Sequence, residues 1–365
     1  MTTEIQPDRL KKLLQEMTDI YSPSGKEEEL IEYIETYLST IGLRSIRQPV
    51  SENRFNLVIV PDKKDEVDLL FIGHVDTVTA FDLEDYGFYE DGDVVYGLGV
   101  ADMKAGCAAM IEAFTVLAAD GEMPSSVGLA LVVGEEEESD GAKTLIRDYS
   151  FPWAIVGEPT NMMPCLGHYG YLEVMLRTRG KRAHSSMPEY GQNAIESMLK
   201  LLLITSEYAS FAKNGLVYNV RELSGFPGGF VVPDTCESWL DLHLPPDSRM
   251  DGLKADLESL VEKAAERIPG LEAHMRFVTT HSGYRISQER PLIKTLRDTF
   301  NKLCLPWEPI DFRSHSDANV LWGAEVAPII LGPGRLETAH TPEESVIFQQ
   351  VEQAARLYLD FARSI

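Results

Sequence analysis

Two histidines and several carboxylates follow apolar or glycine-rich stretches of this sequence, where they could bind metal ions. The run "FIGHVD" ends on His74 and Asp76, the stretch "GLGVADMKAG" contains Asp102, and "LALVVG" is followed by four glutamates. The whole set is His74, Asp76, Asp102, Glu135, Glu136, Glu158 and His340. Two imidazoles with three or four carboxylates suit a borderline cation such as zinc, and the excess of carboxylates indicates two ions that share a bridging ligand.

Each of these residues also has an ordinary structural explanation. A single histidine is more often structural than a metal ligand, and an aspartate before a helix is usually its N-cap. The run Glu135–Glu138, called the acid run below, is typical of a solvated loop or of the first turn of a helix, where the helix dipole favours negative charge. The metal interpretation therefore depends on the residues as a set.

Alternating helix and strand signals indicate how the chain positions these residues. Apolar residues at helical spacing predict helices over 8–21, 25–42 and 101–120, and apolar runs predict strands within 56–60, 67–75, 128–134 and 153–160. Strands without alternation are buried on both faces, which indicates an α/β sheet with helical layers. Most of the polar residues then fall at the carboxyl ends of these strands, where open α/β sheets place their sites.

The pattern changes after about residue 168. Alternating strands are expected within 169–186, 236–246 and 272–280, and helices over 193–211 and 251–268. This β-α-β-β-α-β order, with irregular segments, predicts a small inserted α+β domain over 169–281, between catalytic parts 1–168 and 282–365. The Gly/Pro-rich stretch 223–233 is expected to be a loop, and "APIILGPG" is expected to return to the first sheet.

The composition narrows the class of protein. The 365 residues are 44% hydrophobic and 25% charged, which is typical of a globular chain with more than one core. The formal net charge of -25 disfavours nucleic acid as a partner. The four cysteines form no CxxC pair, the start has no apolar signal core, and no run approaches the roughly 20 apolar residues of a membrane span. We therefore expect a cytoplasmic protein with reduced cysteines and no membrane partner.

The motifs occur in an order that resembles a known family. HxD at 74–76, GxGxADMK at 97–104, the glutamate pair, GEPT at 157–160 and His340 after "GPG" resemble the co-catalytic zinc amidohydrolases. This family includes acetylornithine deacetylase, succinyl-diaminopimelate desuccinylase, aminoacylase, carboxypeptidase G and several di- and tripeptidases. The resemblance implies a zinc exopeptidase-like catalytic domain, with a mixed, mostly parallel sheet flanked by helices. It also implies that the inserted, ferredoxin-like domain is a lid that forms a homodimer.

The resemblance assigns metal ligands residue by residue. His74 and Glu158 would bind a first zinc ion, Glu136 and His340 a second, and Asp102 would bridge the two, with cobalt as a possible substitute for zinc. Asp76 lies two residues after His74, so in a strand both side chains face the same way and the Asp76 carboxylate can orient the imidazole.

Family members carry two adjacent glutamates in the acid run, commonly followed by Gly-Ser and a further glycine. Matching Ser139 and Gly141 to that pattern makes Glu135 the general base and leaves Glu137 and Glu138 as solvated neighbours. Gly134 replaces the family's usual aspartate, so a register shifted by one residue stays open.

His184, in "RAHSSMP", resembles the lid histidine that reaches the partner subunit's site and hydrogen-bonds the developing oxyanion. The alternative is a histidine in a surface turn, with no catalytic role.

The substrate anchor departs from the family pattern. The positions that usually carry asparagine and arginine, which hold a substrate carboxylate, are Phe230 and His243 here. Arg221, Arg313 or Arg335 could replace that anchor. In "SHSDAN", Ser316 and Asp317 either shape the pocket or cap a helix.

The sequence therefore predicts a metal-dependent deacylase for an N-acyl amino acid, of the acetylornithine deacetylase type. Glu135 would activate a metal-bound water molecule in this reaction. Two alternatives stay open. The first is a dipeptidase, aminopeptidase or carboxypeptidase of the same family, which would act on short peptides. The second is a metal-binding pseudoenzyme.

Overall fold

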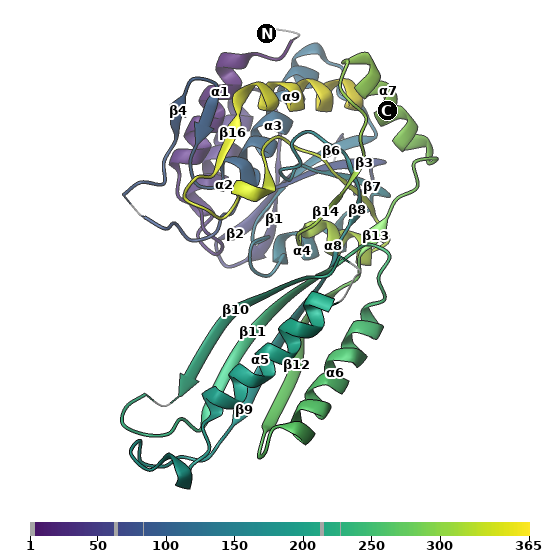
Figure 1. The fold of residues 1–365 in the computed structure, drawn as a ribbon. Helices are drawn as coiled ribbons and strands as arrows, with labels where there is room; N and C mark the ends of the chain where they lie inside the picture. Colours follow the sequence, from purple (N-terminus) through teal and green to yellow (C-terminus); the bar gives the residue numbers. More distant parts are fainter. Residues whose placement is uncertain (1–3, 62–64, 83, 212–214, 227) are drawn as a thin grey trace. The chain divides into compact units, whose positions relative to one another are not determined.

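The chain leaves its first structural unit after residue 166 and returns to it at residue 286. Unit 1 consists of Met1–Leu166, Ile286–Phe312 and Ser316–Ile365, and unit 2 of Gly167–Arg285 and Arg313–His315 (Figure 1). The computed structural model describes residues 4–61, 65–82, 84–211, 215–226 and 228–365. The predicted fold class, α/β with an inserted α+β domain, is confirmed.

Unit 1 alternates strands and helices along most of its length. Its helical elements are α1 (Pro7–Asp19), α2 (Glu28–Thr40), η2 (Val100–Lys104), α3 (Ala105–Asp120), α4 (Asp140–Asp148), α7 (Pro291–Lys302), α8 (Asp317–Gly323), η4 (Leu336–Thr338) and α9 (Phe348–Ala362). Its strands are β1 (Ile46–Ser51), β2 (Arg54–Ile59), β3 (Leu69–His74), β4 (Tyr89–Asp91), β5 (Val94–Tyr96), β6 (Val127–Val132), β7 (Trp153–Val156), β8 (Cys165–His168, which ends in unit 2), β14 (Ile310–Phe312), β15 (Ala327–Ile330) and β16 (Ser345–Ile347).

The main sheet is parallel at its centre and antiparallel towards its edges. Among the described residues it has nine strands in the order β1-β2-β6-β3-β7-β15-β8-β13, where β13 is Tyr284–Arg285, and β14 pairs with β8. The pairs β6–β3, β3–β7 and β7–β15 are parallel, whereas β1–β2, β2–β6 and β15–β8 are antiparallel. A small sheet of β16, β5 and β4 lies apart from it.

The central strands are buried on both faces, as their unalternating sequences predict. Every residue of β3, β6 and β15 is buried. Figure 1 shows α3 and α9 on one side of the sheet and α4 and α8 on the other. Phe71 of β3 packs edge-on against Phe114 of α3 and Tyr358 of α9, with ring centroids 5.7 and 5.6 Å away. Helical layers therefore cover both faces of the sheet.

The helix predicted over 101–120 begins only at Ala105. Its first residues form η2, in which Asp102 and Met103 have non-helical backbone angles and are joined by a cis peptide bond. The sequence "ADMK" is compatible with a helix, but the backbone there follows the contacts of Asp102, which are described below.

Unit 2 pairs a four-stranded antiparallel sheet with two helices. In the described residues the strand order is β10-β11-β9-β12. The elements are β9 (Gly170–Arg179), η3 (Pro188–Tyr190), α5 (Ala194–Phe211), β10 (Val217–Phe226), β11 (Thr235–Leu244), α6 (Met250–Arg267), β12 (Glu272–His281) and β13 (Tyr284–Arg285). Part of the expected loop 223–233 therefore belongs to β10. This edge strand is mostly exposed and lacks the alternation that would have identified it.

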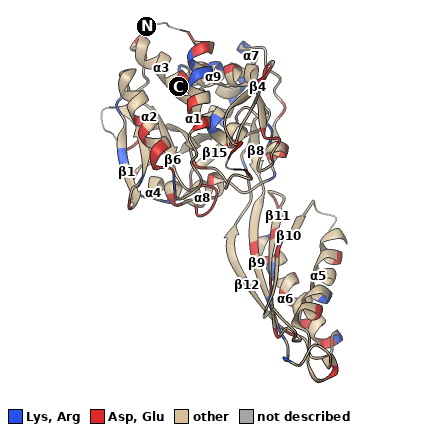
Figure 2. Cartoon of the chain, turned by 90° about the vertical axis from the view of Figure 1, so that its left-hand side faces the viewer, with Lys and Arg blue, Asp and Glu red and all other residues tan. Residues whose placement is uncertain are grey.

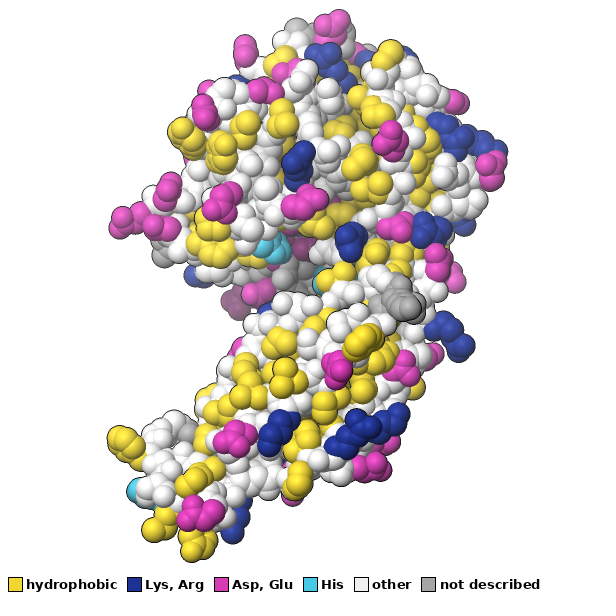
Figure 3. Space-filling view, in the orientation of Figure 1, with side chains coloured by type: hydrophobic (Ala, Val, Ile, Leu, Met, Phe, Trp, Pro, Cys, Tyr) yellow, Lys and Arg dark blue, Asp and Glu magenta, His cyan; other side chains and the backbone are white. Residues whose placement is uncertain are grey.

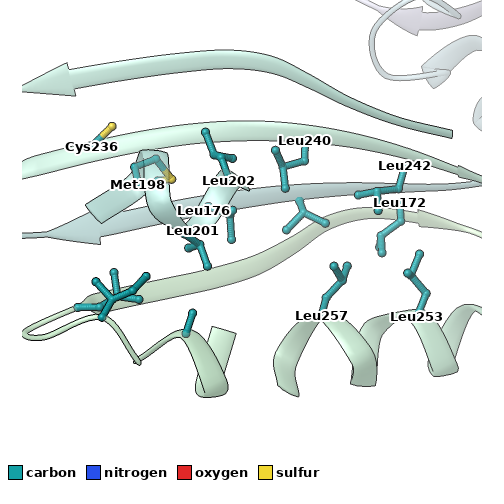
Figure 4. Packing of buried hydrophobic residues seen from close by; sticks show 14 of the residues in the cluster. Leu172, Leu176, Met198, Leu201, Leu202, Cys236, Leu240, Leu242, Leu253 and Leu257 are labelled. Atoms are coloured by element: carbon teal, nitrogen blue, oxygen red, sulfur yellow. The ribbon is translucent and has the colours of Figure 1, made fainter. Parts of the chain in front are cut away.

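The core of unit 2 lies between its sheet and its helices (Figure 4). Leu172, Val174 and Leu176 alternate along β9 with less buried residues, and they pack towards Leu201 of α5 and Leu257 of α6. One face of the sheet is therefore apolar and the other polar, which is the pattern that an antiparallel sheet with a single helical layer requires.

Acidic side chains are spread over both units (Figure 2). Within the described residues, every helix is too short or too polar to cross a membrane. The cytoplasmic location expected from the sequence stays a prediction.

Candidate metal centre

Neighbouring strands of unit 1 end at one edge of the sheet and bring four of the predicted residues there. His74 is the last residue of β3, which lies between β6 and β7 and runs parallel to both. Glu135 and Glu136 follow β6, and Glu158 follows β7. Because the carboxyl ends of parallel strands lie at the same edge of the sheet, these side chains meet there.

Asp102 reaches this edge from the turn η2. The backbone N–H groups of Gly99, Ala101 and Asp102 donate to the buried carboxylate of Glu344, at 2.9, 2.9 and 3.0 Å. Burial and the nearby Asp102 carboxylate raise the pKa of Glu344 to about 7, although the three hydrogen bonds oppose this shift. Glu344 therefore fixes the irregular backbone that carries Asp102.

His340 approaches from the loop before β16. It adopts a left-handed conformation with φ 59°, and its Nε2 lies 2.9 Å from Oε2 of Glu136. The hydrogen bond with Glu136 raises the pKa of His340 to about 9.

The Asp102 carboxylate lies between the two histidines. Its Oδ1 is 3.2 Å from Nε2 of His74, and its Oδ2 is 3.5 Å from Nε2 of His340. Ligand atoms of His74, Asp102 and Glu136 all lie within 4.8 Å of one another. Oε1 of Glu158 lies 3.8 Å from Nε2 of His74. The structure therefore brings together all five predicted metal ligands.

Asp76 contacts His74 and the backbone of Glu135 and Glu136. Nδ1 of His74 is 3.1 Å from the main-chain oxygen of Asp76 and 3.6 Å from its carboxylate. That carboxylate accepts hydrogen bonds from the Ser24 hydroxyl at 2.6 Å and from the backbone N–H groups of Glu135 and Glu136 at 3.1 Å each. Asp76 thus organises the start of the acid run as well as lying next to His74.

The acid run turns two of its glutamates inward and two outward. Glu135 is buried, and its Oε2 lies 3.9 Å from Nε2 of His74. Burial raises the pKa of Glu135 well above its ordinary value, and the carboxylates of Glu158 and Glu136 add to the effect of burial while His74 opposes it. Glu137 and Glu138 are exposed.

The donor set fits a divalent cation. Oε1 of Glu158 is buried and has no hydrogen-bond partner among the described residues. Burial and the neighbouring Asp102 carboxylate raise the pKa of Glu158 to about 8. A cluster of buried carboxylates with two imidazoles is costly unless a cation offsets their charge, and oxygen and imidazole ligands suit zinc or a similar ion.

The model of peptidase family M20/M25/M40 matches residues 70–364 of the chain. The chain belongs to the M20 peptidase family. This confirms the resemblance drawn from the motifs, and it makes the protein an amide hydrolase of a metal-dependent family.

Named relatives of this M20 chain include deacetylases. Acetylornithine deacetylase of Pasteurella multocida is 27% identical over 347 residues, which cover 90% of the chain and 88% of that enzyme. Acetylornithine deacetylase of Aliivibrio salmonicida is 28% identical over 304 residues, which cover 78% of each sequence. A tripeptidase of Staphylococcus aureus has the same fold, with a TM-score of 0.81 at 21% identity over 98% of both chains.

His184 lies in unit 2, whereas all five predicted metal ligands lie in unit 1. It is exposed, its backbone forms an isolated bridge with Val231, and its Nδ1 lies 2.7 Å from Oγ of Ser186. Its role towards a partner subunit stays a prediction.

The residues considered for a substrate anchor have different surroundings. Phe230 is 86% exposed, and Arg221 is bound to Glu173 and Asp241 of neighbouring strands. The rings of His243 and Tyr171 lie 5.2 Å apart, and the guanidinium of Arg313 lies over the ring of Tyr169 at 5.8 Å. Arg335 is exposed next to η4. The pairing of Arg221 with two carboxylates makes it the weakest of the three arginine candidates.

The "SHSDAN" segment caps a helix. Ser316 is the N-cap of α8 and accepts a hydrogen bond from Ala318 N, and it forms a capping box with Asn319. Asp317 is buried at the first residue of this helix, where burial raises its pKa to about 7.

Sequence reasoning missed Glu344 and Ser24, which hold Asp102 and Asp76. Both lie in stretches with clear signals: Glu344 is the second glutamate of "HTPEE", and Ser24 belongs to "SPSG" before α2. A polar residue beside a predicted ligand loop is a candidate for this role, but the sequence does not identify its backbone partners.

Proposed function

We propose that this M20 chain hydrolyses the amide bond of an N-acyl amino acid, as enzymes of the acetylornithine deacetylase type do. The relatives of that name support this substrate class. The observation that carries the reaction type is the position of Glu135. It is a buried carboxylate whose Oε2 lies 3.9 Å from Nε2 of His74, and it is not one of the five ligands that the family resemblance assigns.

We propose two zinc ions per subunit, with cobalt as a substitute. His74, Asp102 and Glu158 would hold the first ion, and Asp102, Glu136 and His340 the second. The two Asp102 oxygens face the two different imidazoles, which supports a bridging carboxylate. When bound, the metal supplies Lewis-acid chemistry that polarises the amide carbonyl and acidifies a water molecule.

The residues of the chain account for the proton transfers. Glu135 takes a proton from the water molecule as the water oxygen bonds to the carbonyl carbon. The same carboxyl group then gives this proton to the amide nitrogen as the C–N bond breaks. Because Asp76 accepts from the Glu135 and Glu136 amides, it holds base and ligand in a fixed relation. His184 of the partner subunit would stabilise the oxyanion.

We also propose that unit 2 is the lid and dimerisation domain and that the protein forms a homodimer through it. Large apolar side chains on α5 and β10 support this assignment. Leu203 and Phe211 on the helix are 70% and 72% exposed, and Phe226 on the strand is 56% exposed. Figure 3 shows exposed hydrophobic side chains on the face of unit 2 where α5 lies. Such patches on otherwise charged surfaces mark interaction sites.

Parallel assays test the substrate class. Zinc- or cobalt-loaded protein should be offered acetyl-ornithine, succinyl-diaminopimelate and a panel of dipeptides under identical conditions. We expect the highest kcat/KM with an N-acyl amino acid. Faster cleavage of dipeptides would favour the peptidase alternative, and no hydrolysis of any substrate would favour a pseudoenzyme.

A further inference from the structure

The turn that carries Glu135 and Glu136 is held from two sides. Its backbone is closed by hydrogen bonds from the N–H groups of Glu138 and Ser139 to the oxygen of Gly134, at 3.2 and 2.7 Å. On one side, Asp76 accepts the amides of Glu135 and Glu136. The contacts on the other side come from β2 and α4, outside the metal-ligand set.

Arg54 of β2 makes those contacts by joining two carboxylates. Its Nε and Nη2 donate to Glu27 at 3.0 and 2.7 Å. Its Nη1 and Nη2 donate to Asp140, the first residue of α4, and the Nη2 contact is 3.2 Å long. Glu27 is fully buried and the Arg54 side chain is only 16% exposed. A planar guanidinium can engage both carboxylates at once, which a lysine ammonium cannot do in the same geometry.

The ion pair of Arg54 and Asp140 packs directly against Gly134, the first residue of the turn. A Cβ atom on Gly134 would lie 2.1 Å from Oδ1 of Asp140 and 2.5 Å from Nη2 of Arg54. Gly134 also has a φ of +76°, which favours glycine. A displacement of Asp140 therefore changes the packing against Gly134, which directly precedes Glu135.

We propose that Arg54 is a positioning residue that fixes the acid-run turn by holding Asp140 against Gly134. Arg54 does not itself meet substrate or metal; it acts through Asp140 and the backbone of the turn. The assignment of Glu135 as base and Glu136 as ligand rests on the proposed function. The contacts that connect Arg54 to the turn through Asp140 do not depend on the proposed function.

The test compares two matched arginine-to-lysine substitutions in the metal-loaded protein. Arg54→Lys removes the fork at the acid run. Arg9→Lys removes a fork of similar burial elsewhere in unit 1, where Arg9 donates two 2.7 Å hydrogen bonds to the fully buried Glu112. We expect Arg54→Lys to lower kcat or zinc affinity by about 10- to 100-fold, as loss of supporting contacts around metal ligands does, with little change in KM. Arg9→Lys should leave both within about twofold of wild type, because the Arg9–Glu112 pair does not contact the acid-run turn.

A second variant keeps the test informative if Arg54→Lys fails to fold. Asp140→Asn keeps the Arg54–Glu27 pair, so no buried charge loses its partner. Hydrogen exchange of segment 134–141 should be faster than in wild type in both Asp140→Asn and Arg54→Lys, and unchanged in Arg9→Lys. The double variant should lose no more activity than the worse single variant, since both changes break the same contact, between Arg54 and Asp140.

The outcomes separate the two proposals. Wild-type exchange of segment 134–141 in Asp140→Asn, or additive losses in the double variant, would overturn the role of Arg54. If the wild-type protein cleaves no amide, the proposed function fails, while zinc affinity and hydrogen exchange still decide whether Arg54 fixes the turn.

Discussion

Unit 1 buries many ionisable side chains, whereas the core of unit 2 is almost entirely apolar. The buried ionisable residues of unit 1 include Glu27, His74, Asp76, Asp102, Glu112, Glu135, Glu158, Asp317 and Glu344. The core cluster of unit 2 is made of leucines with other apolar residues. Buried charge is costly for folding and is concentrated where chemistry requires it. The difference indicates that unit 1 accepts a loss of stability for its site, while unit 2 is built for packing.

Removal of metal should give the largest difference in behaviour between unit 1 and unit 2. We expect a chelator to abolish activity and to speed hydrogen exchange at the ends of β3, β6 and β7, because the clustered carboxylates then repel one another. Exchange in β9 and β11 of unit 2 should stay unchanged. Elemental analysis should find up to two zinc or cobalt ions per chain before chelation. A metal-free preparation with full activity would end the metal interpretation.

The acid run tests which buried charge in unit 1 does the chemistry. Glu135→Ala should retain its metal and lose about 10²- to 10⁴-fold in kcat, the range that a general base contributes. Glu138→Ala is the matched control, because Glu138 is exposed in the same turn. Steady-state kinetics with zinc analysis provides the measurement. Comparable losses in both variants would mean that the register is shifted.

A mixed dimer tests whether the two units meet in one active site. If His184 works in trans, each site combines Glu135 of one protomer with His184 of the other, and both Glu135→Ala and His184→Ala are nearly inactive alone. After subunit exchange in an equal mixture, half of the dimers are mixed and each has one complete site. The mixture should therefore regain roughly a quarter of the wild-type rate. An active His184→Ala homodimer, or no gain despite verified exchange, contradicts action in trans.

The two units should also respond to pH in opposite directions, which is the smallest expected effect. Burial lowers the pKa of His168 in unit 2 to about 4, so unit 2 loses stability as pH falls from about 6.5 towards 4. In metal-free unit 1, burial raises the pKa of Glu158 to about 8, so stability falls as pH rises from about 4.5 towards 8.

Segment-resolved hydrogen exchange in β9 and β3 across pH 4 to 8 measures both trends after correction for the intrinsic exchange rate. Zinc should remove most of the unit 1 trend. His168→Leu should flatten the trend in β9 and leave β3 unchanged, whereas parallel trends in both strands would contradict the assignment.

The sequence was most informative where burial is uniform. The strands that end at His74 and before Glu135 are buried throughout, and the strand before Glu158 is buried except at Trp153, so their apolar runs predict both the strands and the sheet edge where the polar residues meet. Helices α1 and α2 were recognisable from helical spacing because each buries a single apolar face.

The parts that escaped prediction depend on backbone contacts between distant segments. Glu344 binds N–H groups about 240 residues earlier in the chain, and no local pattern encodes such a partner. The same contacts explain why η2 is not a helix. Strand β10 escaped because an exposed edge strand needs no apolar alternation. The role of Arg54 escaped because an arginine in a strand is ordinarily solvent-facing.

The packing of Phe71 between α3 and the last helix, α9, has a consequence for biosynthesis. The core of unit 1 cannot be completed until Tyr358 has left the ribosome, because Phe71 of β3 packs against that ring. Except for residues 313–315, unit 2 is one continuous stretch that emerges earlier. Since domains generally fold as units during synthesis, we expect unit 2 to fold on the nascent chain first. Unit 1 would complete its core only later, when the final helix emerges and covers its central strand.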